Sequence, residues 1–315
     1  MVPKSTDVSV NRQPNKGGAW WRVLVTALVV YVVGIFILVL TGNPNLFPTV
    51  VMLGSFMVPA TYVVFFYERR HLSNLSLVNT AQSFFYGGVL GVFAASILEP
   101  LFVGGSGDIF MFFQVGIVEE FVKIIGVLLI ARRLRHDSEL DGLILGAAAG
   151  MGFAALESTG YAFTAFLQSG GSLSLTVGVT LLRGILSPVG HGTWTAILAG
   201  VLFRESRHGR FRLSRAVVLA YLSVVVLHGL WDSLPGFMSA FVSSGTDLFL
   251  AQALVGLTGL VILWRRWREG TRLQAAEILA AAAVAMPPTG QSDVTTEVTG
   301  PTPVTDEPTS TLRPE

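Results

Sequence analysis

The chain has 315 residues, of which 51% are hydrophobic and 13% are charged, and its mean hydropathy is +0.62. This composition is too apolar for a water-soluble globular protein, and a formal net charge of +1 offers no clustered positive surface for nucleic acid. Because the sequence contains no cysteine, disulfides and thiolate chemistry are excluded, and a transition-metal site must use His, Asp, Glu or water.

Apolar runs long enough to cross a bilayer, at about 20 residues each, follow one another along the chain. They cover residues 20–41, 46–67, 79–103, 109–131, 141–167, 174–203, 213–238 and 247–265. The first run is longer than a signal-peptide core and no cleavage signal follows it, so we expect a retained helix. The sequence therefore predicts an all-α, polytopic transmembrane helical bundle of about eight spans, integral to the cell (plasma) membrane.

The basic residues lie on one side of these spans. All but two of the 21 Lys and Arg fall in segments that share a side, so the positive-inside rule predicts that both termini are cytoplasmic. We expect a cytoplasmic segment at 1–19, a transmembrane domain at 20–268, a short juxtamembrane helix at 269–286 and a disordered cytoplasmic tail at 287–315. Pro, Thr, Ser, Gly and acidic residues dominate this tail and cannot form a core.

Ionisable residues inside the fourth to seventh spans are candidates for function, because a charge at bilayer depth costs several kcal/mol unless it is paired, hydrated or metal-bound. They are Glu119, Glu120, Lys123, Glu157, Arg183, His191, His228 and Asp232. At ~1.5 Å per helical residue, the glutamates and histidines fall roughly at mid-membrane. Carboxylates and imidazoles from four helices are thus predicted to share one layer, as in a catalytic metal site with two or three ligands and a base.

The spacing of these residues suggests how they divide the work. Glu119 and Glu120 point about 100° apart on a helix, so one can serve a site while its neighbour pairs with Lys123 or with another helix. Asp232 follows His228 by four residues and can orient the imidazole or act as a ligand. Each residue alone also fits a structural ion pair or an interhelical hydrogen bond.

Three other features of the sequence bear on this cluster. Gly142, Gly146 and Gly150 recur every four residues and predict a close helix contact that brings Glu157 near its neighbours. The sequence lacks the G-x-S-x-G and H-E-x-x-H motifs of serine hydrolases and zinc peptidases. The string from Gly105 to Asp108 matches the G-x-G-D of aspartyl intramembrane proteases, but it starts a span, so we interpret it as a turn.

Several motifs in order carry a family resemblance. They are Glu119-Glu120-Phe-Val-Lys123; Asp141-Gly142 leading through Gly146, Gly150, Gly152 and Phe153 to Glu157; His191 before Trp194, Thr195 and Gly200; and His228-Gly-Leu-Trp-Asp232. This series, over about residues 80–235, resembles the PrsW family of intramembrane proteases. The resemblance implies a membrane-embedded metallo-endopeptidase, similar in its helical core to CAAX-processing endopeptidases. Its implied substrates are membrane-anchored proteins such as anti-sigma factors.

The resemblance also implies roles for individual residues. Glu157, His191 and His228 would bind Zn²⁺, and Glu120, or alternatively Glu119, would act as general base. Ser158 stands where the family favours Asn, and it is expected to support the site with Lys123 and Asp232. Two alternatives stay open: a proton- or ion-coupled transporter that uses the same groups as a relay, and a noncatalytic scaffold with a protease-like fold.

Overall fold

The computed structural model describes residues 18–105, 108–132, 134, 138–206, 210–239 and 245–285. The predicted cytoplasmic tail and nearly all of the predicted N-terminal segment lie outside the described residues, as does the middle of the string from Gly105 to Asp108. The chain divides into two compact units, Met1–Ala276 and Glu277–Glu315. All packing described below belongs to the first unit.

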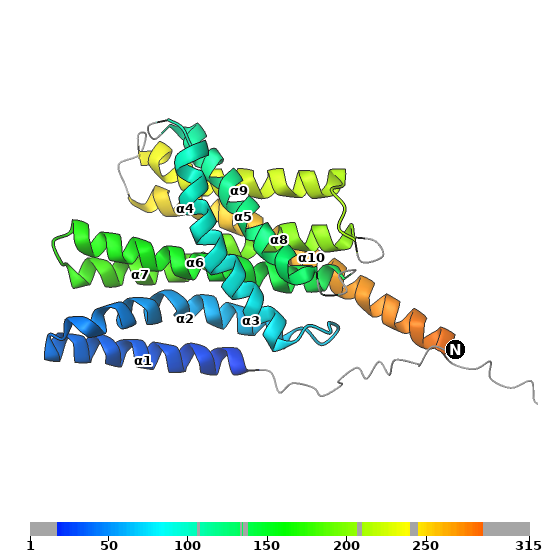
Figure 1. Ribbon diagram of the computed structural model, residues 1–315, viewed down its shortest axis with the longest axis horizontal. Helices are drawn as coiled ribbons and strands as arrows, with labels where there is room; N and C mark the ends of the chain where they lie inside the picture. The colour runs from blue at the N-terminus through cyan, green and yellow to red at the C-terminus, as the bar shows by residue number, and fades with distance from the viewer. Residues whose placement is uncertain are drawn as a thin grey trace, which may run out of the picture. The chain divides into compact units, whose positions relative to one another are not determined.

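The described residues are helical with no β-strand, which confirms the all-α prediction (Figure 1). The elements are α1 (Ala19–Thr41), η1 (Pro44–Leu46), α2 (Phe47–Glu68), α3 (Leu77–Phe85), η2 (Tyr86–Leu90), α4 (Gly91–Phe102), α5 (Ile109–Ala131), α6 (Glu139–Gln168), α7 (Leu173–Leu186), η3 (Ser187–Val189), α8 (His191–Arg204), α9 (Arg215–Ser239) and α10 (Gly245–Ala285). Each predicted span coincides with one helix or with a run of helices joined by a short turn.

Six helical segments of the described chain are long and apolar enough to cross a membrane. They are Ala19–Thr41, Pro44–Glu68, Leu77–Phe102, Glu139–Gln168, Leu173–Arg204 and Arg215–Phe237. α5 and α10 are not among them, and α5 carries three charged residues near its middle. The protein is therefore a multi-pass membrane protein, while the count of eight spans and the side on which the termini lie stay predictions.

α6 is the central helix of the first unit and packs against α2, α3, α5, α7 and α8. Its predicted glycine face lies on α8. A Cβ atom at Gly142, Gly146 or Gly150 would collide with the backbone carbonyl oxygen of Ala199, Thr195 or His191, respectively. The predicted close helix contact is thus confirmed, and it brings the backbone of His191 against α6.

The turn η3 determines where α8 begins. Pro188 lies inside η3, and its ring removes a backbone N–H from the helical ladder, so α7 ends before it. Gly190 follows, and α8 begins at His191. The predicted sixth span is therefore two helices joined by a turn, with the histidine at the joint.

α10 continues without a break from Gly245 to Ala285. Residues 269–285, for which we predicted a short juxtamembrane helix, are helical and continuous with this helix. Arg266 of α10 donates a hydrogen bond to Glu139 at the start of α6, with 2.8 Å between Nε and Oε1. This contact joins the two helices within the first unit.

Candidate metal centre

α5 contributes two carboxylates and an ammonium group that are almost completely buried. The exposed fractions are 5% for Glu119 and 0% for both Glu120 and Lys123. The Lys123 ammonium donates to Glu119 Oε2 and to Glu120 Oε1 at 2.9 Å each. Lys123 therefore pairs with both glutamates, where the sequence suggested only one.

The two glutamates nevertheless face different surroundings. Glu119 lines a cavity, and its Oε2 lies 3.6 Å from His228 Nε2 and 3.8 Å from His191 Nδ1. Glu120 does not line that cavity. Its Oε2 accepts a hydrogen bond from Thr195 Oγ1 at 3.1 Å, and its Oε1 lies 3.1 Å from His228 Nδ1. Glu119 thus faces open space, whereas Glu120 is enclosed between α5, α8 and α9.

The two imidazoles come from α8 and α9 and lie next to each other. Their ring centroids are 5.1 Å apart, and the indole of Trp194 packs 4.7 Å from the ring of His228. Asp232, one turn after His228, places Oδ2 at 3.3 Å from His228 Nε2. The Lys123 ammonium lies 2.7 Å from His191 Nδ1. Both nitrogens of His228 therefore lie beside carboxylates, and Nδ1 of His191 lies beside an ammonium group.

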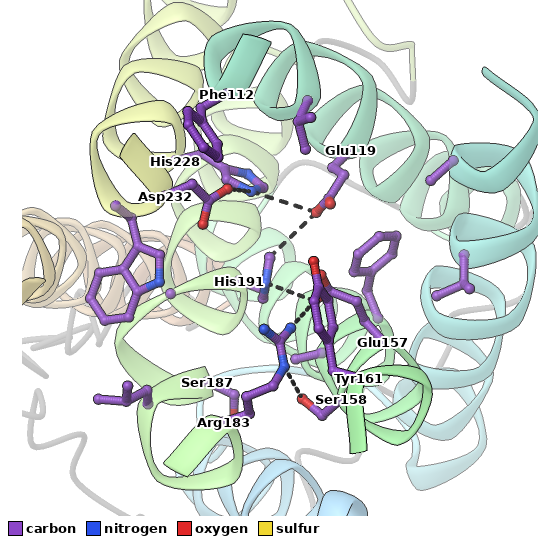
Figure 2. A pocket seen from close by; sticks show the side chains of 18 of the residues that line it. Phe112, Glu119, Glu157, Ser158, Tyr161, Arg183, Ser187, His191, His228 and Asp232 are labelled. Atoms are coloured by element: carbon purple, nitrogen blue, oxygen red, sulfur yellow. Dashed lines mark hydrogen bonds and ion pairs between the residues drawn. The ribbon is translucent and has the colours of Figure 1, made fainter. Parts of the chain in front are cut away.

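Glu157 of α6 contacts the other nitrogen of His191. Its Oε2 lies 3.2 Å from His191 Nε2 and 2.7 Å from the Nη2 of Arg183 on α7 (Figure 2). Arg183 also donates from Nε to Ser158 Oγ at 3.3 Å and stacks 3.9 Å from the ring centre of Tyr161. The sequence assigned no role to Arg183 or Tyr161 in the site, although the position of Arg183 within a span was a visible signal.

A cavity of about 580 Å³ reaches these groups (Figure 2). Its lining includes Glu119, Glu157, His191, His228 and Asp232, together with apolar side chains from α4, α5, α7 and α9. On α5 the lining residues lie in the first half of the helix, and on α9 they lie in the second half. The cavity therefore extends from the histidines toward the start of α5.

Glu119, His191 and His228 together could hold a metal ion. One ligand atom from each lies within 4.8 Å of the other two. Among the described residues, these three form the group of His, Asp or Glu side chains close enough to share a metal ion. Ligand bonds of about 2.0–2.2 Å in a tetrahedral zinc site bring neighbouring donors to roughly 3.3 Å. The separations of 3.6 Å and 3.8 Å from Glu119 Oε2 to the histidine nitrogens are already close to that value.

The donor set also suits a metal chemically. Two neutral imidazoles and one carboxylate form a common hydrolytic zinc set with a position left open for water. The sequence predicted Glu157 as the third ligand. The structure places Glu157 outside the group of three, on the far side of the His191 ring and paired with Arg183.

The chain is similar to known proteins over part of its length. Residues 76–264 match the model of a family described as PrsW family intramembrane metalloprotease. A curated relative, protease PrsW of Oceanobacillus iheyensis, is 25% identical over 154 residues, which cover 49% of this chain and 61% of the relative. The chain thus spans less than two thirds of that relative's length. No solved structure matches.

Proposed function

This chain belongs to the PrsW family of intramembrane metalloproteases, and on that premise we propose that it hydrolyses peptide bonds of membrane-anchored proteins with Zn²⁺ held by Glu119, His191 and His228. The observation that supports this most directly is the meeting of one carboxylate and two imidazoles from three helices at a cavity. Zinc is the metal we propose because histidine and glutamate donors at a hydrolytic site suit it best.

Two further carboxylates set the orientation of the imidazoles. Glu120 accepts a hydrogen bond from Nδ1 of His228, and Glu157 accepts one from Nε2 of His191. The remaining nitrogens, Nε2 of His228 and Nδ1 of His191, are those nearest to Glu119. Carboxylates that hydrogen-bond metal-bound histidines typically fix the ring and its tautomer in this manner.

Lys123 compensates the charge of the paired glutamates. In this structure its ammonium also touches Nδ1 of His191 at 2.7 Å. Binding of an ion at that nitrogen requires the ammonium to turn away from it, and the contacts to Glu119 and Glu120 at 2.9 Å give the ammonium two carboxylates on which to remain. We propose that Lys123 holds Glu119 in place and is not itself a proton donor to substrate.

For the general base we propose a different residue from the two that the sequence suggested. Glu120 is completely buried and has three partners, and Glu119 belongs to the ligand group. Asp232 lines the cavity beside His228 and is 32% exposed in its side chain. We therefore propose that Asp232 accepts a proton from the attacking water. The bound ion would supply a Lewis acid that polarises the scissile carbonyl.

The cavity gives the substrate its place. At about 580 Å³ it has the size of a typical ligand pocket. Its apolar lining includes Phe112, Leu182 and Trp231, which can receive a segment of substrate chain that leaves the lipid. Membrane-anchored anti-sigma factors, implied by the family resemblance, are the first substrate class to test.

Metal analysis and cleavage assays with purified variants test the proposal. We expect wild-type protein to hold one zinc ion per chain, His191→Ala to hold none, and Asp232→Asn to keep zinc but lose cleavage. Glu205→Gln, at the far end of α8, is the control and should behave as wild type. Cleavage by a wild-type protein without stoichiometric metal would overturn the zinc assignment, and full cleavage by Asp232→Asn would overturn the base.

The transporter alternative predicts a different result. A proton relay built from the same groups gives charge movement across proteoliposomes and needs no bound metal. Charge movement without cleavage of any membrane-anchored substrate would favour that alternative over the protease.

A further inference from the structure

Arg183 is a charged residue of the cavity that the proposed mechanism does not use. It lies on α7, whereas the ligand group comes from α5, α8 and α9. Its guanidinium makes three contacts, all with residues of α6: the carboxylate of Glu157, the hydroxyl of Ser158 and the ring of Tyr161. A guanidinium inside a membrane-spanning helix requires such compensation, and here one of its partners also contacts the candidate metal centre.

The contacts form a continuous series that ends at a metal ligand. Arg183 Nη2 lies 2.7 Å from Glu157 Oε2, and the same oxygen lies 3.2 Å from His191 Nε2 (Figure 2). His191 Nδ1, on the opposite edge of the ring, faces Glu119. Whatever fixes the Glu157 carboxylate therefore fixes the direction in which His191 presents its second nitrogen.

The planar guanidinium is suited to this task. Arginine remains charged at any pH relevant to proteins, and its rigid fork can engage two acceptors at once. Nη2 contacts Glu157 while Nε donates to Ser158, so two neighbouring residues of α6 hold one edge of the guanidinium. Ser158 is 2% exposed, so its hydroxyl is a buried acceptor for Arg183.

Packing alone does not explain Arg183. The neighbours of Arg183 on α7 are loosely covered, with exposed fractions of 46% for Leu182 and 64% for Ile185. A side chain that served only to attach α7 could be apolar, as these are. The polar contacts of Arg183 instead converge on the carboxylate that orients His191.

We infer that Arg183 is a positioning residue of the candidate metal centre: its guanidinium holds the Glu157 carboxylate against His191 Nε2, so that His191 Nδ1 faces Glu119. The inference rests on the proposed function, because it assigns His191 as a metal ligand. It adds a residue from a helix that contributes no ligand, and it makes the position of α7 part of the metal site.

A double-mutant cycle on zinc affinity tests the inference. Zinc affinity of the purified full chain in detergent is measured by chelator competition for wild type, Arg183→Gln, Glu157→Gln and the double variant. Loss of a group that orients a metal-bound histidine typically weakens metal binding by about 10–100-fold. We expect each single variant to fall in that range and the double variant to be no weaker than Glu157→Gln alone. Arg183→Lys should fall between wild type and Arg183→Gln.

The matched control is Arg204→Gln. Arg204 and Arg183 have side chains exposed to 28% and 29%, and both pair with carboxylates, but Arg204 lies at the end of α8 among Glu205 and Glu269. The zinc affinity of the Arg204→Gln variant should equal that of wild type. Wild-type affinity in Arg183→Gln, or a double variant whose loss is the product of the two single losses, would overturn the inference.

Further variants and a second measurement keep the inference testable if Arg183→Gln does not fold or if the protein binds no zinc. If Arg183→Gln does not fold, Arg183→Lys and Ser158→Ala take its place in the cycle. If wild type binds no zinc, the metal assignment fails by itself, and nitrogen-15 NMR of His191 then tests the positioning. We expect the proton on Nε2 in wild type and in Arg204→Gln, and a mixture of tautomers in the Arg183 variant. An unchanged tautomer in that variant would overturn the inference.

Discussion

Two clusters of ionisable side chains lie at different levels of α6 and α8. The first is the candidate metal centre. The second, called here the α10 clasp, consists of Glu139, Arg204, Glu205, Arg266 and Glu269. In the clasp, Arg266 contacts Glu139 and Glu269 at 2.8 Å each, and Arg204 lies 3.8 Å from Glu269. Both clusters pair a carboxylate of α6 with a cation from another helix, yet we propose chemistry for only one.

The difference lies in the other groups and in access. The clasp contains carboxylates and guanidinium groups but no imidazole, and none of its residues lines the cavity at the metal centre. The metal centre has two imidazoles, more carboxylates than cations at its cavity, and open space beside them. Buried charge by itself therefore indicates helix attachment as readily as catalysis. Two imidazoles beside a carboxylate at a cavity distinguish the catalytic candidate.

The largest expected effect belongs to the imidazoles. His228→Ala removes a proposed ligand, so we expect cleavage of a membrane-anchored substrate to fall on the order of 10³-fold or more, with the helical fold retained. Cleavage rates and circular dichroism of the purified variant measure the two parts. Retention of more than a tenth of the wild-type rate would place His228 outside the machinery and would remove the contrast with the clasp.

Lys123→Met should produce the largest loss of stability. It leaves Glu119 and Glu120 buried without their shared cation, and breaking a buried ion pair from one side costs about 3–5 kcal/mol. Denaturant unfolding in detergent measures this change. Combining Lys123→Met with Glu119→Gln and Glu120→Gln should restore part of the stability, and an undiminished loss in that combination would argue against charge as its cause.

Glu139→Gln tests the clasp in the same way. The Glu139 side chain is 2% exposed and Arg266 is 17% exposed, so removal of the negative charge leaves Arg266 with Glu269 as its charged partner. We expect a loss of about 1–3 kcal/mol in the free energy of unfolding and no change in zinc affinity. A clear loss of zinc affinity in this variant would show that the two clusters are coupled through α6.

The smallest effect is expected for Glu269→Gln. The Glu269 side chain is 49% exposed, so water screens both its 2.8 Å pair with Arg266 and its longer pair with Arg204 at 3.8 Å. Exposed ion pairs typically contribute less than about 1 kcal/mol and are screened by salt. The unfolding free energies of wild type and variant should differ slightly at low salt and become equal at high salt. A salt-independent loss larger than this would mean that the clasp is less hydrated than its exposure indicates.

The sequence predicted the fold more completely than the site. The length and apolarity of each run predicted a helix, because a chain in lipid must satisfy its backbone hydrogen bonds within the segment. The predicted runs all coincide with helical segments. The turn η3 inside the sixth run and the length of α10 were not foreseen, because both depend on how neighbouring helices pack.

The sequence by itself determined which chemical groups enter the membrane: absence of cysteine and the placement of Glu119, Glu157, His191 and His228 near mid-span limit any metal site to imidazole and carboxylate ligands. Only the tertiary structure decided which carboxylate meets both histidines. Glu119 and Glu120 are neighbours in sequence, but the rotation of α5 against α8 and α9 turns one toward the cavity and encloses the other. Arg183 entered the site for the same reason, since sequence spacing sets directions along one helix, whereas contacts between helices depend on how their surfaces pack.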